Sequence, residues 1–311
     1  MPPQRRRCPM EVGLHIPQVG PFARRDVIGR FARAAEEAGF DGLWVFDHVV
    51  IRKEQGSAYP YSPDGRLGFR PTLDFLEPLT LLAFVAAVTS RIRLGTSVLV
   101  LPMRHPVLHA KVLATIDHLS GGRLILGGGV GWWKEEFEVL GVPFERRGKR
   151  TEEWLRLVRA LWTEEWVQFR GEFYECVDWT CNPKPVNGTI PIWLGGESEG
   201  QLRRVGRYAD GWLATAKSLP VLEQRFEIAR QAARSAGRDA SALTLALEGA
   251  GVISSETMES TAEHLESLAR RGVAHAICLI DPRAYGEAEA LIARFGRDYL
   301  PRLHAAAAAR P

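Results

Sequence analysis

Residues 91–137 read R-I-R-L-G-T-S-V-L-V-L-P-M-R-H-P-V-L-H-A-K-V-L-A-T-I-D-H-L-S-G-G-R-L-I-L-G-G-G-V-G-W-W-K-E-E-F. This stretch of the chain decides its fold. The apolar run 92–101 has the composition of a strand buried on both faces, as in parallel sheets covered by helices. Apolar residues at helical spacing follow over 106–119 and end at Gly121-Gly122. A second short strand begins at Leu124. The stretch therefore predicts a strand–helix–strand unit, followed by a Gly-rich turn that opens another helix.

The same alternation of apolar strands and helical patterns runs through the whole chain. Eight such pairs favour a closed (β/α)8 TIM barrel over an open doubly wound sheet. A dinucleotide-binding sheet would also need G-x-G-x-x-G after its first strand, where this chain has H-I-P-Q. We expect strands at 12–16, 43–46, 92–101, 124–126, 192–194, 211–213, 243–247 and 274–279, and helices at 25–38, 75–89, 106–119, 149–162, 199–208, 219–236, 260–271 and 284–296.

Two insertions interrupt this alternation. Residues 51–73 follow the second strand, and residues 164–190 follow the helix after the fourth strand. The second insertion contains W-V-Q-F-R-G-E-F-Y, which predicts a short hairpin. Long loops in a compact domain are commonly functional, and barrel active sites lie at the carboxyl ends of the strands. We therefore expect both insertions to cover that end and to select the substrate.

The composition is that of a globular protein with a large core. The chain has 311 residues, of which 46% are hydrophobic, and its net charge of +3 is too small to predict a nucleic-acid partner. We expect one barrel domain over 11–300, a disordered extension over 1–10 and a frayed tail over 301–311. No apolar run suits a membrane span or a signal peptide, so a cytoplasmic location is expected.

No metal site is predicted. The four cysteines are scattered, and the spacing of Cys176 and Cys181 matches no common zinc motif, which indicates free thiols. His105 and His109 are four residues apart, but no H-E-x-x-H pattern contains them.

Two places in the sequence offer groups for proton transfer. Asp47 and His48 follow the second strand, and histidine is the side chain best suited to exchange protons near neutral pH. The alternative is a histidine that caps a loop, and Asp47 is expected to orient His48 or a backbone amide. Glu135 and Glu136 follow Trp132-Trp133 and would act as general acids if they lay between aromatic rings. The alternative is an acidic helix start, and of the two acids we favour Glu136 as catalytic.

Three further features suggest ligand binding. Gly195, Gly196 and Ser198 precede a predicted helix, where exposed amides attract phosphate. The run 127–131, which contains Gly129 and Gly131, would let a flat ring approach the backbone. His15 ends the first strand, where it would touch a ring or a substrate.

Several motifs together resemble one known family. They are V-G-L-H-I-P at 12–17, G-L-W-V-F-D-H-V-V at 42–50, L-G-T-S-V-L-V-L-P at 94–102, H-L-S-G-G-R-L-I-L-G-G-G-V-G-W at 118–132, G-E-F-Y at 171–174, N-P-K-P-V at 182–186 and P-I-W-L-G-G-E-S at 191–198. The chain resembles the luciferase-like monooxygenase superfamily of (β/α)8 barrels, and within it the branch that uses the deazaflavin coenzyme F420. The resemblance extends to about residue 295.

The resemblance implies roles for particular residues. It places His48 near the reactive carbon of the deazaflavin. It also implies a cis peptide bond between Ser97 and Val98, in a bulge that supports the back of the ring. The implied catalytic residues are His48 and Glu136. The implied cofactor-binding residues are His15, Asp47, Thr96, Ser97, Val98, Gly129, Gly131, Gly195, Gly196 and Ser198. The pocket is expected to be aromatic, with Trp44, Phe46, Tyr61, Trp132 and Trp133, and the cations that could line its mouth are Arg52, Lys53, Arg66, Arg70, Arg104 and Lys217.

The resemblance implies an oxidoreductase that transfers a hydride between F420 and a small organic substrate, with His48 taking or donating the proton. One alternative is a monooxygenase that uses reduced FMN and oxygen, together with a partner reductase. Another is a protein that binds F420 without turnover. A homodimer is expected through barrel helices. Trp154, Leu157, Leu161 and Trp162 would supply its surface, although they fit a core-facing stripe equally well.

Overall fold

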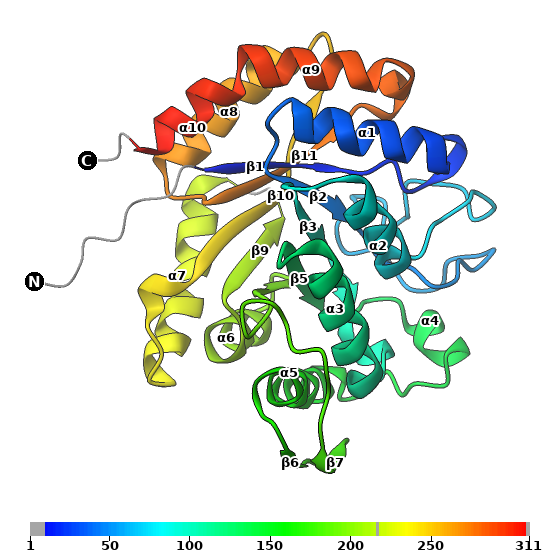
Figure 1. Cartoon of the computed structure of the whole chain (residues 1–311), viewed down its shortest axis with the longest axis vertical. Helices are drawn as coiled ribbons and strands as arrows, with labels where there is room; N and C mark the ends of the chain where they lie inside the picture. Colours follow the sequence, from blue (N-terminus) through cyan, green and yellow to red (C-terminus); the bar gives the residue numbers. More distant parts are fainter. Residues whose placement is uncertain (1–9, 216–217, 309–311) are drawn as a thin grey trace, which may run out of the picture.

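The structure, a computed structural model, describes residues 10–215 and 218–308 and confirms the predicted (β/α)8 barrel (Figure 1). A nine-stranded parallel sheet closes on itself where β3 pairs with β5. Since β3 and β4 are two parts of one interrupted strand, the barrel has eight strand positions. The strands are β1 Glu11–His15, β2 Gly42–Val45, β3 Arg93–Thr96, β4 Leu99–Val100, β5 Leu124–Gly129, β8 Ile192–Gly195, β9 Gly211–Thr215, β10 Thr244–Ile253 and β11 His275–Ile280.

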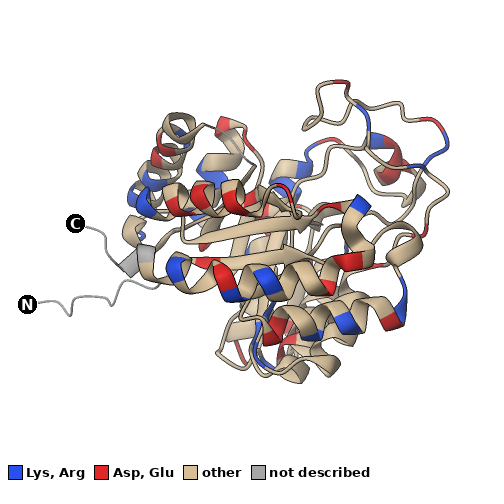
Figure 2. Cartoon of the chain, turned by 90° about the horizontal axis from the view of Figure 1, so that it is seen from above, with Lys and Arg blue, Asp and Glu red and all other residues tan. Residues whose placement is uncertain are grey.

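Helices surround the barrel, each with an apolar side against the strands (Figure 1). The eight expected helices are confirmed as α1 Arg25–Glu37, α2 Pro78–Val88, α3 Pro106–Ser120, α5 Arg147–Thr163, α6 Glu199–Tyr208, α7 Leu219–Ser235, α8 Met258–Arg270 and α9 Ala288–Asp298. Trp154, Leu157, Leu161 and Trp162 on α5 are all buried in the core of the chain. Of their two interpretations, the core-facing stripe is therefore correct. Lys, Arg, Asp and Glu are interspersed along the outer helices and loops (Figure 2).

Trp44 fills the inside of the barrel. Its indole stacks on Trp193, with ring centroids 5.5 Å apart, and packs with Leu213 and Ile277. Glycines make this possible, because a Cβ atom on Gly95 of the neighbouring strand would lie 2.3 Å from the Trp44 ring. Trp44 was expected in the ligand pocket, but it lies in the closed part of the barrel, and the residues of its cluster that line the pocket are Val98 and Leu213.

The two insertions differ in structure and in position. Residues 51–73, here named the 51–73 loop, form no regular helix or strand and lie beside the short helix α4 Lys134–Val139 (Figure 1). The 164–190 insertion contains the predicted hairpin, β6 Val167–Arg170 and β7 Glu175–Trp179. Figure 1 shows this hairpin on the far side of α5 from the barrel. The backbone amides of Glu172 and Phe173 donate to Glu153 of α5, which holds the insertion there.

The ends of the chain require corrections. Residues 1–9 of the expected extension lie outside the described residues, but Met10 is buried in the core. The expected frayed tail is wrong for 301–308, because α10 Leu300–Ala308 is a helix. Leu300 and Leu303 are one helical turn apart and buried, so they give the Ala-rich segment a packing face that its composition conceals. Residues 309–311 lie outside the described residues.

Within residues 10–215 and 218–308, none of the helices is both long enough and apolar enough to cross a membrane.

Glu36 connects the end of α1 to the segment that leads into β3. Its Oε1 atom accepts hydrogen bonds from the backbone N–H groups of Ser90, Arg91 and Ile92, at 2.9, 2.6 and 2.9 Å. Burial raises the pKa of Glu36, but these hydrogen bonds outweigh it, so the pKa lies below the usual 4.5. Glu36 thus fixes the entry to the strand that carries the bulge.

Glu36→Gln is expected to lower the free energy of unfolding by about 2 kcal/mol near neutral pH, since bonds to a charged acceptor are lost. Because the pKa is lowered on folding, this contribution is complete above pH 4.5 and is lost as the pH falls through the lowered value. Urea unfolding at about pH 7 and about pH 4 measures it. Glu37→Gln, a change at the exposed neighbouring position, is the control. Equal stabilities for the two variants near pH 7 would contradict the assignment.

Candidate active site

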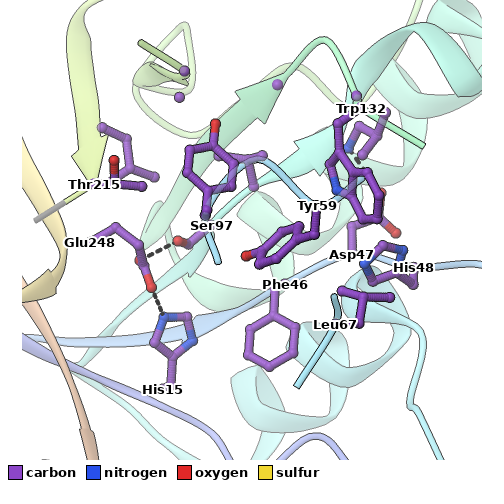
Figure 3. Close-up of a pocket in the computed structure, with 18 of the residues that line it drawn as sticks. His15, Phe46, Asp47, His48, Tyr59, Leu67, Ser97, Trp132, Thr215 and Glu248 are labelled. Carbon is purple, nitrogen blue, oxygen red and sulfur yellow. Dashed lines mark hydrogen bonds and ion pairs between the residues drawn. The ribbon is translucent and has the colours of Figure 1, made fainter. Parts of the chain in front are cut away.

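A cavity of about 400 Å³ lies at the carboxyl ends of the barrel strands (Figure 3). Its size is typical of sites for small molecules and cofactors. Strand ends form most of the wall, and the 51–73 loop adds Tyr59, Tyr61, Leu67, Gly68 and Phe69. The expectation that this loop covers the active end of the barrel is therefore confirmed. The 164–190 insertion contributes no described lining residue, because it is bound to α5, and its expected place at the cavity is corrected.

The peptide bond between Ser97 and Val98 is cis, as predicted, and it separates β3 from β4. The Val98 side chain projects into a space between two glycines. A Cβ atom would lie 2.6 Å from Val98 on Gly129 and 2.8 Å from it on Gly195. These glycines thus make room for the bulge itself, while their backbones also line the cavity.

His48 lies in the cavity wall and is held from behind. Its Nδ1 atom is 3.0 Å from Oε2 of Glu136. The rings of Phe75 and Trp133 meet the imidazole edge-on, with centroids 5.7 and 5.3 Å away. Because Nδ1 is engaged, Nε2 is the nitrogen left to exchange a proton with a bound molecule.

Glu136, predicted as a proton donor, does not line the cavity. It lies in the first turn of α4 and is 3% exposed. Besides His48, it accepts hydrogen bonds from the N–H groups of Val49 at 2.6 Å and Val50 at 3.3 Å. Glu136 is therefore a positioning residue for His48.

Glu135 also faces away from the cavity. It accepts hydrogen bonds from the backbone N–H of Ser57 at 2.9 Å and from its hydroxyl at 2.6 Å, and it lies 3.5 Å from Arg52. The hydroxyl bond is the main reason that the pKa of Glu135 is lowered. Two adjacent acids thus have separate partners: Glu136 holds His48, and Glu135 holds the 51–73 loop.

Asp47 orients a backbone amide, which is one of its two expected roles. Its Oδ2 atom accepts a hydrogen bond from Val100 N–H at 2.9 Å and from Arg104 Nε–H at 3.3 Å. Burial raises the pKa of Asp47 even though Arg104 opposes that shift. Asp47 contributes to the cavity wall, but its carboxylate holds the segment that follows the bulge.

Other predicted residues divide between the cavity and the surrounding structure. His15, Ser97, Val98, Gly129, Gly131, Gly195 and Gly196 line the cavity. Thr96 and Ser198 do not line it. The Thr96 hydroxyl donates to the carbonyl of Gly127 at 2.7 Å inside the sheet. Ser198 is the N-cap of α6, where its hydroxyl accepts from Gln201 N–H.

The expected aromatic and basic residues are also only partly present. Phe46, Tyr61 and Trp132 line the cavity, whereas Trp133 stacks behind Trp132 at 5.3 Å. Arg104 is engaged with Asp47. Arg52, Lys53 and Arg66 line a separate hollow of the 51–73 loop. Arg70 lines neither space, and Lys217 lies outside the described residues.

Glu248 is the most important residue that the sequence analysis missed. Its Oε1 atom is 2.6 Å from Nε2 of His15, and the Ser97 hydroxyl donates to Oε2 (Figure 3). The signal was available, because Glu248 directly follows the predicted strand 243–247. A polar residue at that end of a barrel strand faces the active site.

The described residues contain no group of three or more His, Cys, Asp or Glu side chains arranged to hold a metal ion. The cavity instead combines an imidazole, a carboxylate and aromatic rings with exposed glycine backbone. Such a wall suits a flat ring and the transfer of protons.

Comparison with known proteins yields similarities along most of the chain. The family model for luciferase-like monooxygenases matches residues 10–310. An uncharacterized protein of Mycobacterium tuberculosis is 42% identical over 182 residues, which are 58% of this chain and 62% of that protein. The chain thus spans less than two thirds of the length of this relative.

An F420-dependent glucose-6-phosphate dehydrogenase of Amycolatopsis mediterranei is 31% identical over 230 residues, 70% of this chain and 64% of the relative. Among solved structures, the F420-dependent tetrahydromethanopterin reductase of Methanopyrus kandleri superposes with a TM-score of 0.72 at 18% identity. That match covers 95% of this chain and 99% of the reductase. At this identity, the structural likeness shows the fold alone.

Gly129→Ala is expected to destabilise the protein by about 1–3 kcal/mol, because the new methyl group would overlap Val98. Thermal unfolding measures the loss. Gly200→Ala is the control, since a Cβ there meets nothing within 4 Å. Val98→Ala introduced together with Gly129→Ala should recover part of the stability that Gly129→Ala alone loses. If the stability changes of the two single variants simply add in the double variant, the two positions do not interact.

Proposed function

The chain belongs to the luciferase-like monooxygenase family, and from this premise we propose that it is an oxidoreductase that transfers a hydride between coenzyme F420 and a small organic substrate. The observation that carries the proposal is the arrangement of His48, whose ring lies in the cavity wall with Nδ1 on Glu136. The relative from Amycolatopsis supports the choice of F420, since its name gives that cofactor.

The residues of the cavity fit a flat ring system with an anionic tail. Val98 and the bare backbones of Gly129 and Gly195 would support one face of the ring, and Tyr59 and Phe46 would lie beside it. Gly196 also lines the cavity and precedes α6, whose first N–H groups favour a phosphate. When bound, F420 accepts or delivers a hydride at its ring carbon C5.

His48 moves the proton that accompanies the hydride. With Nδ1–H donating to Glu136, Nε2 takes the hydroxyl proton of an alcohol or returns it to a carbonyl oxygen. The Glu136 carboxylate, 3.0 Å away, favours the imidazolium that forms when Nε2 takes the proton. The amides of Val49 and Val50 keep this carboxylate in place, so the imidazole needs no reorientation.

The 51–73 loop reduces the access of water to this proton. Tyr59 packs against Trp132 with ring centroids 5.1 Å apart, and Phe69 lies 6.4 Å from the His48 ring. Together they form an apolar wall around the imidazole. In such surroundings the electrostatic effect of Glu136 on His48 is stronger than it would be in water.

The choice of cofactor is tested by titrating the purified protein with F420 and with FMN, using quenching of tryptophan fluorescence. Trp132 lines the cavity, so a bound ring should quench it. We expect F420 to bind with a dissociation constant in the micromolar range or tighter, and FMN at least about tenfold more weakly. The opposite order would replace the proposal by a two-component flavin monooxygenase that uses oxygen.

His48→Ala is expected to lower kcat by about 10²–10⁴-fold with F420 affinity nearly unchanged, because a proton-transfer group is lost. Glu136→Gln should lower kcat less and leave KM unchanged, as expected for a residue that acts through His48. Steady-state kinetics with reduced and oxidised F420 measure both. His118→Ala, an exposed change on α3, is the control. Full activity of His48→Ala would support F420 binding without a catalytic role for this site.

A further inference from the structure

Glu248 is the last residue of β10 in regular register before an irregularity of that strand, and it lies on the same inward face as Ala246. Pairing of β10 with β11 shifts register between Glu248 and Gly251, and Gly249 adopts a left-handed φ of 65°. Bulges of this kind redirect side chains and are frequent beside active sites. Here the bulge follows directly on Glu248, whose carboxyl group faces His15 at the end of β1 and Ser97 between β3 and β4 (Figure 3).

The polar cluster of His15, Ser97 and Glu248 leaves hydrogen-bonding capacity unused. Each Glu248 oxygen has one partner in the cluster, whereas a carboxylate has about four acceptor positions. The Glu248 side chain is 24% exposed and lines the cavity. On the other side of the cluster, His15 Nδ1 is buried and has no hydrogen-bond partner. The cluster is therefore open to a ligand.

The Glu248 carboxyl group has few partners within the protein. In residues 10–215 and 218–308, no arginine or lysine forms an ion pair with it, and its ion-pair partner is His15. The adjacent interior of the barrel is apolar, with Leu213 and Ile277 packed on Trp44. A carboxylate at the edge of an apolar core is costly unless a donor or a cation meets it. His15 and the Ser97 hydroxyl meet the carboxyl group inside the cluster, so the acceptor positions left for a ligand are those on the side of the cavity that Glu248 lines.

We propose that Glu248 is a specificity-determining acceptor that binds an N–H or O–H group, neutral or cationic, of the molecule at the polar cluster, and that it disfavours anionic groups there. The proposal deepens the proposed function, because it rests on the same cavity. Two sources have the required chemistry. One is an N–H of the cofactor ring, and the other is a hydroxyl or amine of the substrate.

The position of Glu248 relative to His48 supports a division of tasks. In Figure 3 the polar cluster lies on one side of the cavity and His48 with Trp132 on the other, with Phe46 and Tyr59 between them. A bound molecule would thus meet a hydrogen-bond acceptor on one side and a proton-exchanging group on the other. Such a pair of contacts fixes the orientation of a ligand as well as its charge.

The test uses three probes of one shape and different charge: benzylamine, benzyl alcohol and benzoate. Their dissociation constants are measured by calorimetry for the full chain without cofactor. We expect benzylamine to bind more tightly than benzoate. Glu248→Gln should reduce this preference by about tenfold or more, because it removes the carboxylate that attracts the amine and repels benzoate. Glu256→Gln, a change of an exposed carboxylate after β10, should leave the preference intact. The comparison between variants isolates Glu248 from every other charge.

A preference that is equal in the wild type, Glu248→Gln and Glu256→Gln would overturn the proposal. If Glu248→Gln does not fold, as judged by circular dichroism, Glu248→Met provides the same comparison with an apolar side chain of similar length.

Repeating the titrations with saturating F420 distinguishes the two sources of the donor group, the cofactor ring and the substrate. If bound F420 prevents benzylamine from binding, the group that donates to Glu248 belongs to the cofactor ring. If benzylamine still binds in the presence of F420, the donor belongs to the substrate. Since the probe preference is measured without cofactor, a failure of F420 to bind would reject the proposed function alone.

Discussion

The barrel depends on one packing constraint, which is that Trp44 fills its interior. A barrel of this size must be filled by side chains, and a single indole stacked on Trp193 occupies a large part of the space. Glycine on the neighbouring strand makes this possible, since any side chain at Gly95 would overlap the indole. The filled interior closes one end of the cavity. The functional groups then project from the ends of the strands into the space that remains.

The cavity wall also depends on a side chain that packs closely against glycines of neighbouring strands. Val98, on the cis bulge, fits only because Gly129 and Gly195 lack side chains, so three strands meet at one valine. The titratable groups are fixed by partners from other elements: His48 by α4, Asp47 by β4 and Arg104, and Glu248 by β1 and the bulge. A site built this way is preorganised, because no single segment positions it.

The sequence predicted the barrel because periodic apolar segments report which faces are buried, and the eight strands and their helices follow that pattern. The bulge at Ser97–Val98 followed from family resemblance, since no local property distinguishes it. The sequence predicted the direction of individual side chains less well. Glu136, Thr96 and Ser198 lie near cavity residues in sequence but point elsewhere. One residue along a strand reverses the face, and one residue along a helix turns the side chain by about 100°. Glu248 was missed although it directly follows the predicted strand 243–247 and lies on the same inward face as Ala246. The prediction of a frayed tail was wrong for 301–308 because it followed the Ala-rich composition, whereas Leu300 and Leu303 are buried and give α10 a packing face.

The adjacent acids of α4 have a consequence for how this enzyme scaffold can diversify. Glu136 fixes the chain at Val49 and Val50, and Glu135 fixes it again at Ser57, while Gln55 bonds to the carbonyl of Gly65 and to the amide of Leu67 within the same loop. The loop is thus attached at its start and braced internally, and its tip carries aromatic and apolar side chains into the cavity. Replacement of that tip would alter which molecules fit without moving the imidazole. In the proposed function, the residues that select the substrate and those that hold the proton-exchanging imidazole are thus different residues of one continuous peptide.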